Sequence, residues 1–200
     1  MTPAILGSSR SLWWPARLAS AAVALLTACS PPVFKSVDVT GADYARGFSL
    51  ESASGGKRSL ADFRGKVVAV FFGFTQCPDV CPTTLSDFAM AKKKLGADGD
   101  KLQVVFITLD PERDTPALLQ QYVPGFDPTF VALYGSLEQT AATAKDFKVF
   151  YQKVPGKTAD SYSIDHTAGA FVFDREGRLR LFMRHGTTPD DMAADIRRLL

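Results

Sequence analysis

The sequence has neither a strong net charge nor a long apolar run. Its 23 basic and 21 acidic side chains give a formal charge of +2 at pH 7, and this balance gives no indication of nucleic-acid binding. The basic run 92–94 lies beside Gly96 and fits a helix C-terminus, where cations complement the helix dipole. The apolar stretch LASAAVALL at 18–26 is shorter than the about 20 residues that a transmembrane helix needs.

Acidic residues are absent before Asp38. Arg10 and Arg17 precede the short apolar stretch, and this arrangement is typical of an export signal. We therefore expect residues 1–28 to be a cleaved signal peptide. The letters LTAC, which end at Cys29, resemble the lipobox of bacterial lipoproteins, and this implies a lipid on Cys29. The alternative is an ordinary signal that leaves Cys29 as a spare thiol, which is unusual in an exported protein.

Internal repeats and low-complexity blocks are also absent, so we expect a single domain. A composition of 46% apolar and 22% charged residues is ordinary for such a domain. Residues 29–45 are proline, small and polar residues without a helical or strand period, which predicts a flexible tether. The folded domain is then expected at 46–200.

Strand and helix signals alternate along this domain. Continuous valine and phenylalanine predict buried strands at 66–74 and 102–110, and a Gly-Gly turn predicts a short hairpin at 47–60. Helix signals begin at Pro82, Thr115, Ser136 and Thr188, and the turn REG predicts a closing hairpin at 169–186. This order predicts an α/β fold, a thioredoxin-like sandwich whose central mixed β-sheet is flanked by helices, with an N-terminal β-hairpin extension.

Two of the three cysteines stand four positions apart where the first buried strand gives way to a helix. In FGFTQCPDVCPTTL at 72–85, Pro82 fits the first helical position, so Cys81 is expected near the N-cap with Cys77 just before it. Because a helix N-terminus favours thiolate, we expect a lowered pKa for Cys81 first and for Cys77 next. Outside the cytoplasm such thiols are paired, metal-bound or catalytic.

A third donor is offered by one of only two histidines. His166 directly precedes the closing hairpin, whose first strand is expected beside the cysteine-bearing strand, whereas His185 is expected at the surface. Two thiolates and one imidazole suit copper, while a closed zinc site would need a fourth ligand. The alternatives are purely structural roles. His166 could be a core or loop histidine whose ring nitrogens are hydrogen-bonded, and Cys77 and Cys81 could form a static disulfide, which this spacing would strain.

Three segments resemble the signature segments of the Sco family, copper-binding thioredoxin-like proteins that help to assemble cytochrome c oxidase. The segments are DFRGKVVAVFFGFTQCPDVCPTTL, TLDPERDTPALLQQY and DHTAGAFVFDREG. The resemblance covers roughly 46–200. It implies that Cys77, Cys81 and His166 bind one copper ion, as Cu(I) or Cu(II), and that the two cysteines form a disulfide when oxidised.

The resemblance also implies supporting residues and partners. Asp79 and Asp110 match family positions for partner contact or site integrity, and Tyr162 and Asp165 are candidates to orient the histidine ring. The implied partners are the oxidase subunit that carries the binuclear copper site, a copper donor chaperone, and the membrane through a lipid anchor. The protein would be a lipoprotein of the bacterial cell membrane that faces the periplasm. Gln76 departs from the family, because many members have histidine there.

A second function remains open on the same residues. Cys77 could attack a disulfide or a peroxide and Cys81 could resolve it, which would make the protein an extracytoplasmic thiol-disulfide oxidoreductase or peroxidase. The Cys-x-x-x-Cys spacing differs from the Cys-x-x-Cys of thioredoxins, and DHTAGA lacks the proline that thioredoxins place before the corresponding strand. These two differences argue against a general reductase.

Overall fold

A computed structural model describes residues 1–4, 33–158 and 161–200, and the domain is one compact unit, Val33–Leu200. The apolar run of the predicted signal peptide and the predicted lipid site at Cys29 lie outside the described residues. Within the part of the chain that is described, no helix has both the length and the apolarity to cross a membrane.

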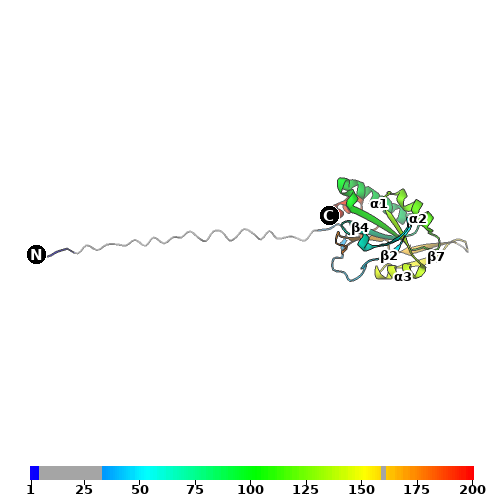
Figure 1. The fold of residues 1–200 in the computed structure, drawn as a ribbon, viewed down its shortest axis with the longest axis horizontal. Coiled ribbons are helices and arrows are strands. Elements are labelled where there is room, and N and C mark those ends of the chain that lie inside the picture. The colour runs from blue at the N-terminus through cyan, green and yellow to red at the C-terminus, as the bar shows by residue number, and fades with distance from the viewer. Residues whose placement is uncertain (5–32, 159–160) are drawn as a thin grey trace. The chain divides into compact units, whose positions relative to one another are not determined.

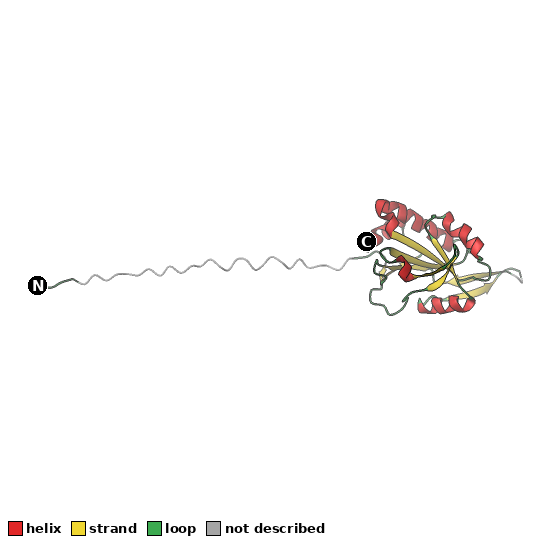
Figure 2. Ribbon diagram, viewed as in Figure 1, coloured by secondary structure: helices red, strands yellow, loops and turns green. Residues whose placement is uncertain are grey.

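The domain combines a central sheet with helices on both of its faces (Figures 1 and 2). The strands are β1 Val37–Asp38, β2 Ser49–Ser52, β3 Lys57–Ser59, β4 Val67–Gly73, β5 Leu102–Thr108, β6 Val131–Tyr134, β7 Tyr151–Pro155, β8 Tyr162–His166, β9 Gly169–Phe173 and β10 Leu179–Arg184. The helices are α1 Val80–Leu95, α2 Pro116–Tyr122, α3 Leu137–Asp146 and α4 Pro189–Arg197, with short 3₁₀ helices at Leu60–Phe63, Gly96–Lys101 and Val123–Gly125.

Eight strands form the central sheet in the order β1-β10-β9-β4-β5-β6-β2-β3. The strands β4, β5 and β6 run parallel, and the remaining pairs are antiparallel. The helices α1, α2 and α4 contribute to the apolar cluster on one face, and α3 contributes to the cluster on the other. The predicted α/β sandwich with a mixed sheet is therefore confirmed, and so is its N-terminal hairpin, β2–β3.

The centre of the sheet follows from the two most apolar stretches of the domain. Every residue of β4 and β5 is buried, as expected for strands that are covered on both faces. Thr115, Ser136 and Thr188 each accept a backbone N–H at the start of the next helix, which confirms the predicted caps. The fully buried strand β4 thus gives a rigid starting point for the loop that leads into α1.

The tether predicted at residues 29–45 extends too far along the chain. Residues 33–45 are folded onto the domain: β1 pairs with β10, and Ala45 is 1% exposed. The fully buried carboxylate of Asp195 accepts the backbone N–H groups of Lys35 and Ser36, both at 2.8 Å. Proline and polar residues alone suggested a linker, because these partners lie about 160 positions away in the sequence.

The sequence patterns also missed β6 and the hairpin β7–β8. The strand β6 has only four residues, and β7 and β8 together have one buried residue, Ile164, so none of the three has a long continuous apolar run. The hairpin β7–β8 forms a two-stranded sheet of its own, apart from the central sheet. His166 is its last residue rather than part of a plain loop.

Candidate metal centre

The two cysteines lie at the junction between β4 and α1. Cys77 donates its backbone N–H to the carbonyl of Phe74 at 3.3 Å, which turns the chain directly after the buried strand. The helix α1 begins at Val80 with Asp79 as its N-cap. Cys81 is therefore the second helical residue, and Pro82 is the third and not the first as predicted.

A glycine makes room for the inner thiol. The side chain of Cys81 is completely buried. A Cβ atom on Gly73 would lie 2.7 Å from the Cys81 Sγ and 2.9 Å from the ring of Phe106, distances that side chains do not tolerate. The close approach of Cys81 to the end of β4 thus depends on glycine at position 73.

The hairpin β7–β8 brings the histidine to the cysteines. The strand that follows it, β9, pairs with β4 and carries the end of β8 to the α1 loop. The His166 ring packs edge-on against Phe71 and Phe74, with centroids 6.3 and 6.1 Å away. His166 Nε2 lies 3.6 Å from the Cys81 Sγ. The ligand atoms of Cys77, Cys81 and His166 all lie within 4.8 Å of one another.

The hydrogen bond of the second ring nitrogen, Nδ1, determines the tautomer of His166. Nδ1 lies 3.0 Å from the backbone carbonyl of Thr167, and a carbonyl can only accept, so Nδ1 carries the proton. In the neutral ring Nε2 then keeps its lone pair and directs it toward the thiols. This is the tautomer that a metal-binding imidazole needs.

The two thiols differ sharply in acidity. The hydrogen bond from the Cys81 thiol lowers the pKa of Cys77 to about 5, against the opposing effect of burial, and the backbone N–H groups of Asp79 and Cys81 add to the lowering. The same hydrogen bond, together with burial, raises the pKa of Cys81. We predicted a lowered pKa for Cys81 first and for Cys77 next. The direction is as predicted for Cys77 and wrong for Cys81, because Cys81 points into the core, whereas the Cys77 Sγ accepts the Cys81 N–H at 3.4 Å.

Of the predicted supporting acids, Asp79 and Asp165 are exposed and line a hollow beside the thiols. Asp110 is buried, and it accepts the Tyr162 hydroxyl at 2.8 Å. Tyr162 and Asp165 were expected to orient the His166 ring, but Thr167 makes that contact. Asp165 lines the same hollow as His166, while Tyr162 lies at the other end of β8 and binds Asp110.

Three residues near the centre were not predicted as site residues. Asp114 is 1% exposed and binds Thr75, at the start of the cysteine loop, through its backbone N–H and its hydroxyl. Burial raises the pKa of Asp114, although hydrogen bonds from Thr108 and Thr75 oppose the shift. Arg113 and Gln76 contact each other above the loop. The signal for Arg113 and Asp114 was the charged cluster that directly follows the buried strand β5.

The second histidine lies outside the cluster. The side chain of His185 is exposed, as predicted, and its Nδ1 lies 3.2 Å from the hydroxyl of Thr84. Its backbone N–H binds the carbonyl of Ala168. His185 is thus near the centre without contributing to the group of ligand atoms.

The hollow beside the thiols is open and has a volume of about 280 Å³. It is lined by Phe74, Cys77, Pro78, Asp79, Val80, Ser163, Ile164, Asp165, His166 and Ala168. Its walls thus come from the cysteine loop on one side and from β8 on the other. A ligand group from another molecule could reach Cys77 and His166 through it.

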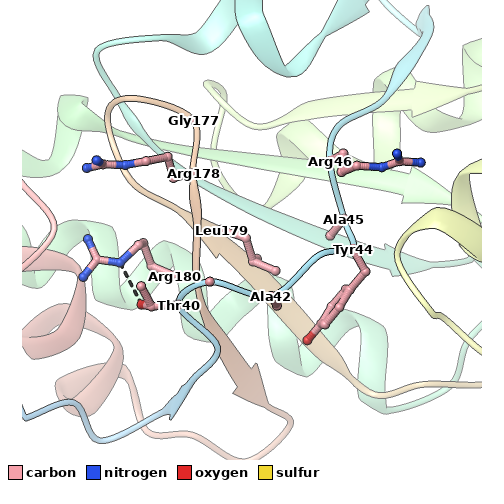
Figure 3. Close-up of a pocket in the computed structure, with 10 residues that line it drawn as sticks. Thr40, Ala42, Tyr44, Ala45, Arg46, Gly177, Arg178, Leu179 and Arg180 are labelled. Carbon is pink, nitrogen blue, oxygen red and sulfur yellow. Dashed lines mark hydrogen bonds between the residues drawn. The ribbon is translucent and has the colours of Figure 1, made fainter.

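A larger hollow, of about 540 Å³, lies elsewhere, between residues 40–46 and the turn that joins β9 to β10 (Figure 3). Arg46 pairs with Asp146, Arg180 pairs with Asp174, and Arg178 pairs with both Asp174 and Glu176. Arg180 also donates to the Thr40 hydroxyl at 3.0 Å, the contact dashed in Figure 3. With its arginines neutralised in this way, the hollow lacks the charge of an anion site.

The donor set of the cluster suits a soft ion. Two sulfurs and one imidazole nitrogen are enough for Cu(I), whereas a structural zinc ion takes four ligands. Among the described residues, these three are the ones that group as a metal site. The hollow leaves the centre accessible from one side.

Comparison with known proteins identifies the family. The model of the SCO1/SenC family matches residues 37–200. The chain belongs to the SCO1/SenC family. This SCO1/SenC chain is 37% identical over 153 residues to the mitochondrial protein SCO2 homolog of Mus musculus. The aligned residues cover 76% of this chain and 60% of the mouse protein. The chain therefore spans about 60% of the length of that relative.

Solved SCO1/SenC structures share the fold. A structure of Bradyrhizobium japonicum ScoI with copper bound is 39% identical, has a TM-score of 0.70, and covers 77% of this chain and 98% of that one. Apo Sco1 from Thermus thermophilus is 40% identical with a TM-score of 0.75, covering 84% and 98%. A SCO1/SenC family lipoprotein from Bacillus anthracis is 25% identical with a TM-score of 0.63, covering 76% and 92%.

Proposed function

We propose that this protein binds one copper ion through Cys77, Cys81 and His166 and assists the assembly of the binuclear copper site of cytochrome c oxidase. The family is one of copper-binding proteins linked to cytochrome c oxidase assembly. The observation that carries the proposal is the grouping of the three ligand atoms within 4.8 Å, with His166 Nε2 facing the thiols and Nδ1 facing the Thr167 carbonyl. Copper is cargo in this function, and it leaves by ligand exchange with a partner.

The chain's own residues divide the work. Cys77 is half-buried and has the lower pKa, so its thiolate is available at neutral pH to an ion or a partner that enters the hollow. Cys81 is held at the back of the site by Gly73 and the core. His166 closes the third side from β8. A partner would therefore replace Cys77 or His166 before it replaces Cys81.

Copper uptake by the purified domain tests this function. We expect one copper ion per chain for the wild type. Replacing His166 with alanine should weaken the affinity by more than the roughly 10–100-fold that loss of a ligand's hydrogen-bond partner costs. His185→Ala is the matched control, because it removes the other histidine from the neighbourhood of the same helix. Wild-type affinity in His166→Ala would refute the three-ligand site.

We also propose a membrane tether and its partners. A lipid on Cys29 would hold the domain at the bacterial cell membrane facing the periplasm, where an oxidase subunit with the binuclear copper site and a copper donor chaperone would meet it. The tether would run from residue 29 to about residue 32, since residues 33–45 are part of the fold. Cys29→Ser should release the protein from membranes, and the mass of the mature N-terminus should show the lipid.

The low pKa of Cys77 favours a second candidate function, reduction of a partner's disulfide. The Cys77 thiolate would attack one sulfur of that disulfide and the other would leave as a thiolate. Cys81 would then displace the partner's first sulfur, so that Cys77 and Cys81 become a disulfide and the partner gains two electrons. Deletion of the gene separates the functions: oxidase activity restored by added copper indicates delivery, and activity restored only by a reductant indicates thiol reduction.

A further inference from the structure

The guanidinium of Arg113 contacts both segments that carry the proposed ligands. Its Nη1 donates to the side-chain oxygen of Gln76 at 3.1 Å and to the backbone carbonyl of Tyr162 at 2.8 Å. Gln76 directly precedes Cys77, and Tyr162 begins the strand that ends at His166. One nitrogen atom of Arg113 thus links the cysteine loop to the histidine strand.

On the strand side, Arg113 binds the backbone carbonyl and the ring of Tyr162 directly and its hydroxyl through Asp110. The carbon of its guanidinium lies 3.5 Å from the centre of the Tyr162 ring, at the distance of a cation–π contact. Its Nε is paired with the buried carboxylate of Asp110. Asp110 in turn accepts the Tyr162 hydroxyl at 2.8 Å. The backbone, the ring and the hydroxyl of Tyr162 are therefore all fixed by the segment 110–113.

On the loop side, Arg113 reaches the wall of the site. Its guanidinium carbon lies 5.9 Å from the centre of the Phe74 ring, and Phe74 packs edge-on against the His166 ring. The Arg113 side chain is 19% exposed, so most of it lies away from water, where polar contacts are stronger. Arg113 therefore contacts the loop on which the cysteines turn and the aromatic ring on which His166 rests.

The hairpin β7–β8 needs such contacts because the central sheet does not hold it. Among the described residues, its ladder pairs only β7 with β8. Besides its continuity with β9, its attachments include Arg113 to Tyr162 and the ion pair of Lys153 with Glu112. Both attachments start from the segment that follows β5. Ile164 of β8 is buried in the apolar core and holds the middle of the strand. The Lys153 pair is about half exposed and contributes little, so Arg113 is the principal polar anchor of the hairpin.

We infer that Arg113 is a positioning residue that holds His166 in reach of the two thiols, and this inference deepens the proposed copper site. A planar fork is required, because the group must meet a carboxylate, a carbonyl and an amide oxygen while it lies flat on a ring. Lysine keeps the charge but lacks the fork. We therefore expect lysine to fail at this position.

Two variants and one control test the inference. Arg113→Lys and Arg113→Met should each weaken Cu(II) affinity roughly tenfold or more, the scale for loss of a ligand's supporting contact. Both should also reduce the nitrogen hyperfine coupling in the electron paramagnetic resonance spectrum, because His166 is no longer held. Arg46→Lys is the matched control: Arg46 also binds an aspartate through two nitrogens, at Asp146, but on the exposed surface. It should leave both readings unchanged.

A measurement on the metal-free protein, the imidazole resonances of His166, tests this inference separately from the proposed function. In the reduced apo protein, the imidazole resonances of His166 should shift or broaden in the Arg113 variants, since its packing against Phe74 loosens. If wild type takes up no copper, the proposed function fails and this reading still decides the role of Arg113. Wild-type imidazole resonances in a folded Arg113→Lys protein would overturn the inference. If both Arg113 variants fail to fold, Gln76→Ala, which removes only the loop contact, takes their place: shifted His166 resonances support the inference and unchanged resonances overturn it.

Discussion

The two sides of the candidate metal centre are attached to the fold in different ways. The cysteines follow β4, which lies at the middle of an eight-stranded sheet with every residue buried. His166 ends a two-stranded, mostly exposed hairpin that side chains fasten to the domain. The cysteine side thus continues from a core strand, whereas the histidine side belongs to a separate hairpin that packs against the core. Opening of the centre should begin on the histidine side, since local opening favours regions with few buried contacts.

The largest expected effect comes from disturbing the cysteine side. Gly73→Ala places a methyl group 2.7 Å from the Cys81 Sγ, and overpacking of this kind costs about 1–3 kcal/mol. Urea unfolding should measure the loss, and faster alkylation of Cys81 should accompany it. Gly125→Ala is the control, because a Cβ there meets nothing within 4 Å. Equal stability of the two variants would contradict a tightly built cysteine side.

A smaller effect is expected on the histidine side. Tyr162→Phe removes the hydroxyl that binds Asp110 and should cost about 1 kcal/mol. Hydrogen exchange should speed up in β7 and β8 and stay unchanged in β4 and β5. Equal acceleration in the central sheet would show that the two sides open together, which would break the distinction between them.

The acidity of the thiols offers a pH test within the cysteine side. Because its folded pKa is lowered to about 5 from an ordinary 9.0, Cys77 favours the folded state increasingly as the pH rises above 5, and this contribution is lost as the pH falls through 5. The stability difference between wild type and Cys77→Ser, measured on reduced metal-free protein, should therefore grow from pH 5 to pH 8. Alkylation of Cys77 should have its midpoint near pH 5. A midpoint near pH 9 would contradict the stabilisation of the Cys77 thiolate by the hydrogen bond from the Cys81 thiol.

The smallest effect is expected at the rim. Asp79→Asn and Asp165→Asn change exposed side chains that line the hollow, so stability should change by less than about 0.5 kcal/mol. Copper affinity should stay within about twofold, since neither acid contacts His166. A loss of oxidase assembly with unchanged copper affinity would assign these acids to partner contact.

The sequence predicted the parts of the fold whose causes are local. Each of these signals is contained in a short stretch of the sequence. They are the apolar runs of β4 and β5, the helix caps at Thr115, Ser136 and Thr188, and the hairpin turn. The three residues of the cluster were identified because the chain has few other soft donors.

Two of the misses have distant causes. Which thiol becomes the thiolate depends on which side chain faces the core, and the spacing of Cys77 and Cys81 does not show this. Arg113 and Tyr162 lie 49 positions apart, so their contact leaves no local pattern. The strand β8 does alternate Tyr162, Ile164 and His166 with polar residues, but over only five positions, and the prediction overlooked this short signal.

The strand β1 has a consequence for the solubility of the protein. It is only two residues long, yet it covers the outer edge of β10, whose sequence LRLFMR is rich in apolar residues. An uncovered strand of this kind offers its free N–H and C=O groups to a second chain. The opposite border of the sheet is guarded differently, by the short β3 with Lys57 and Arg58. A protein that started at residue 46 would keep its metal centre but would expose β10 and self-associate.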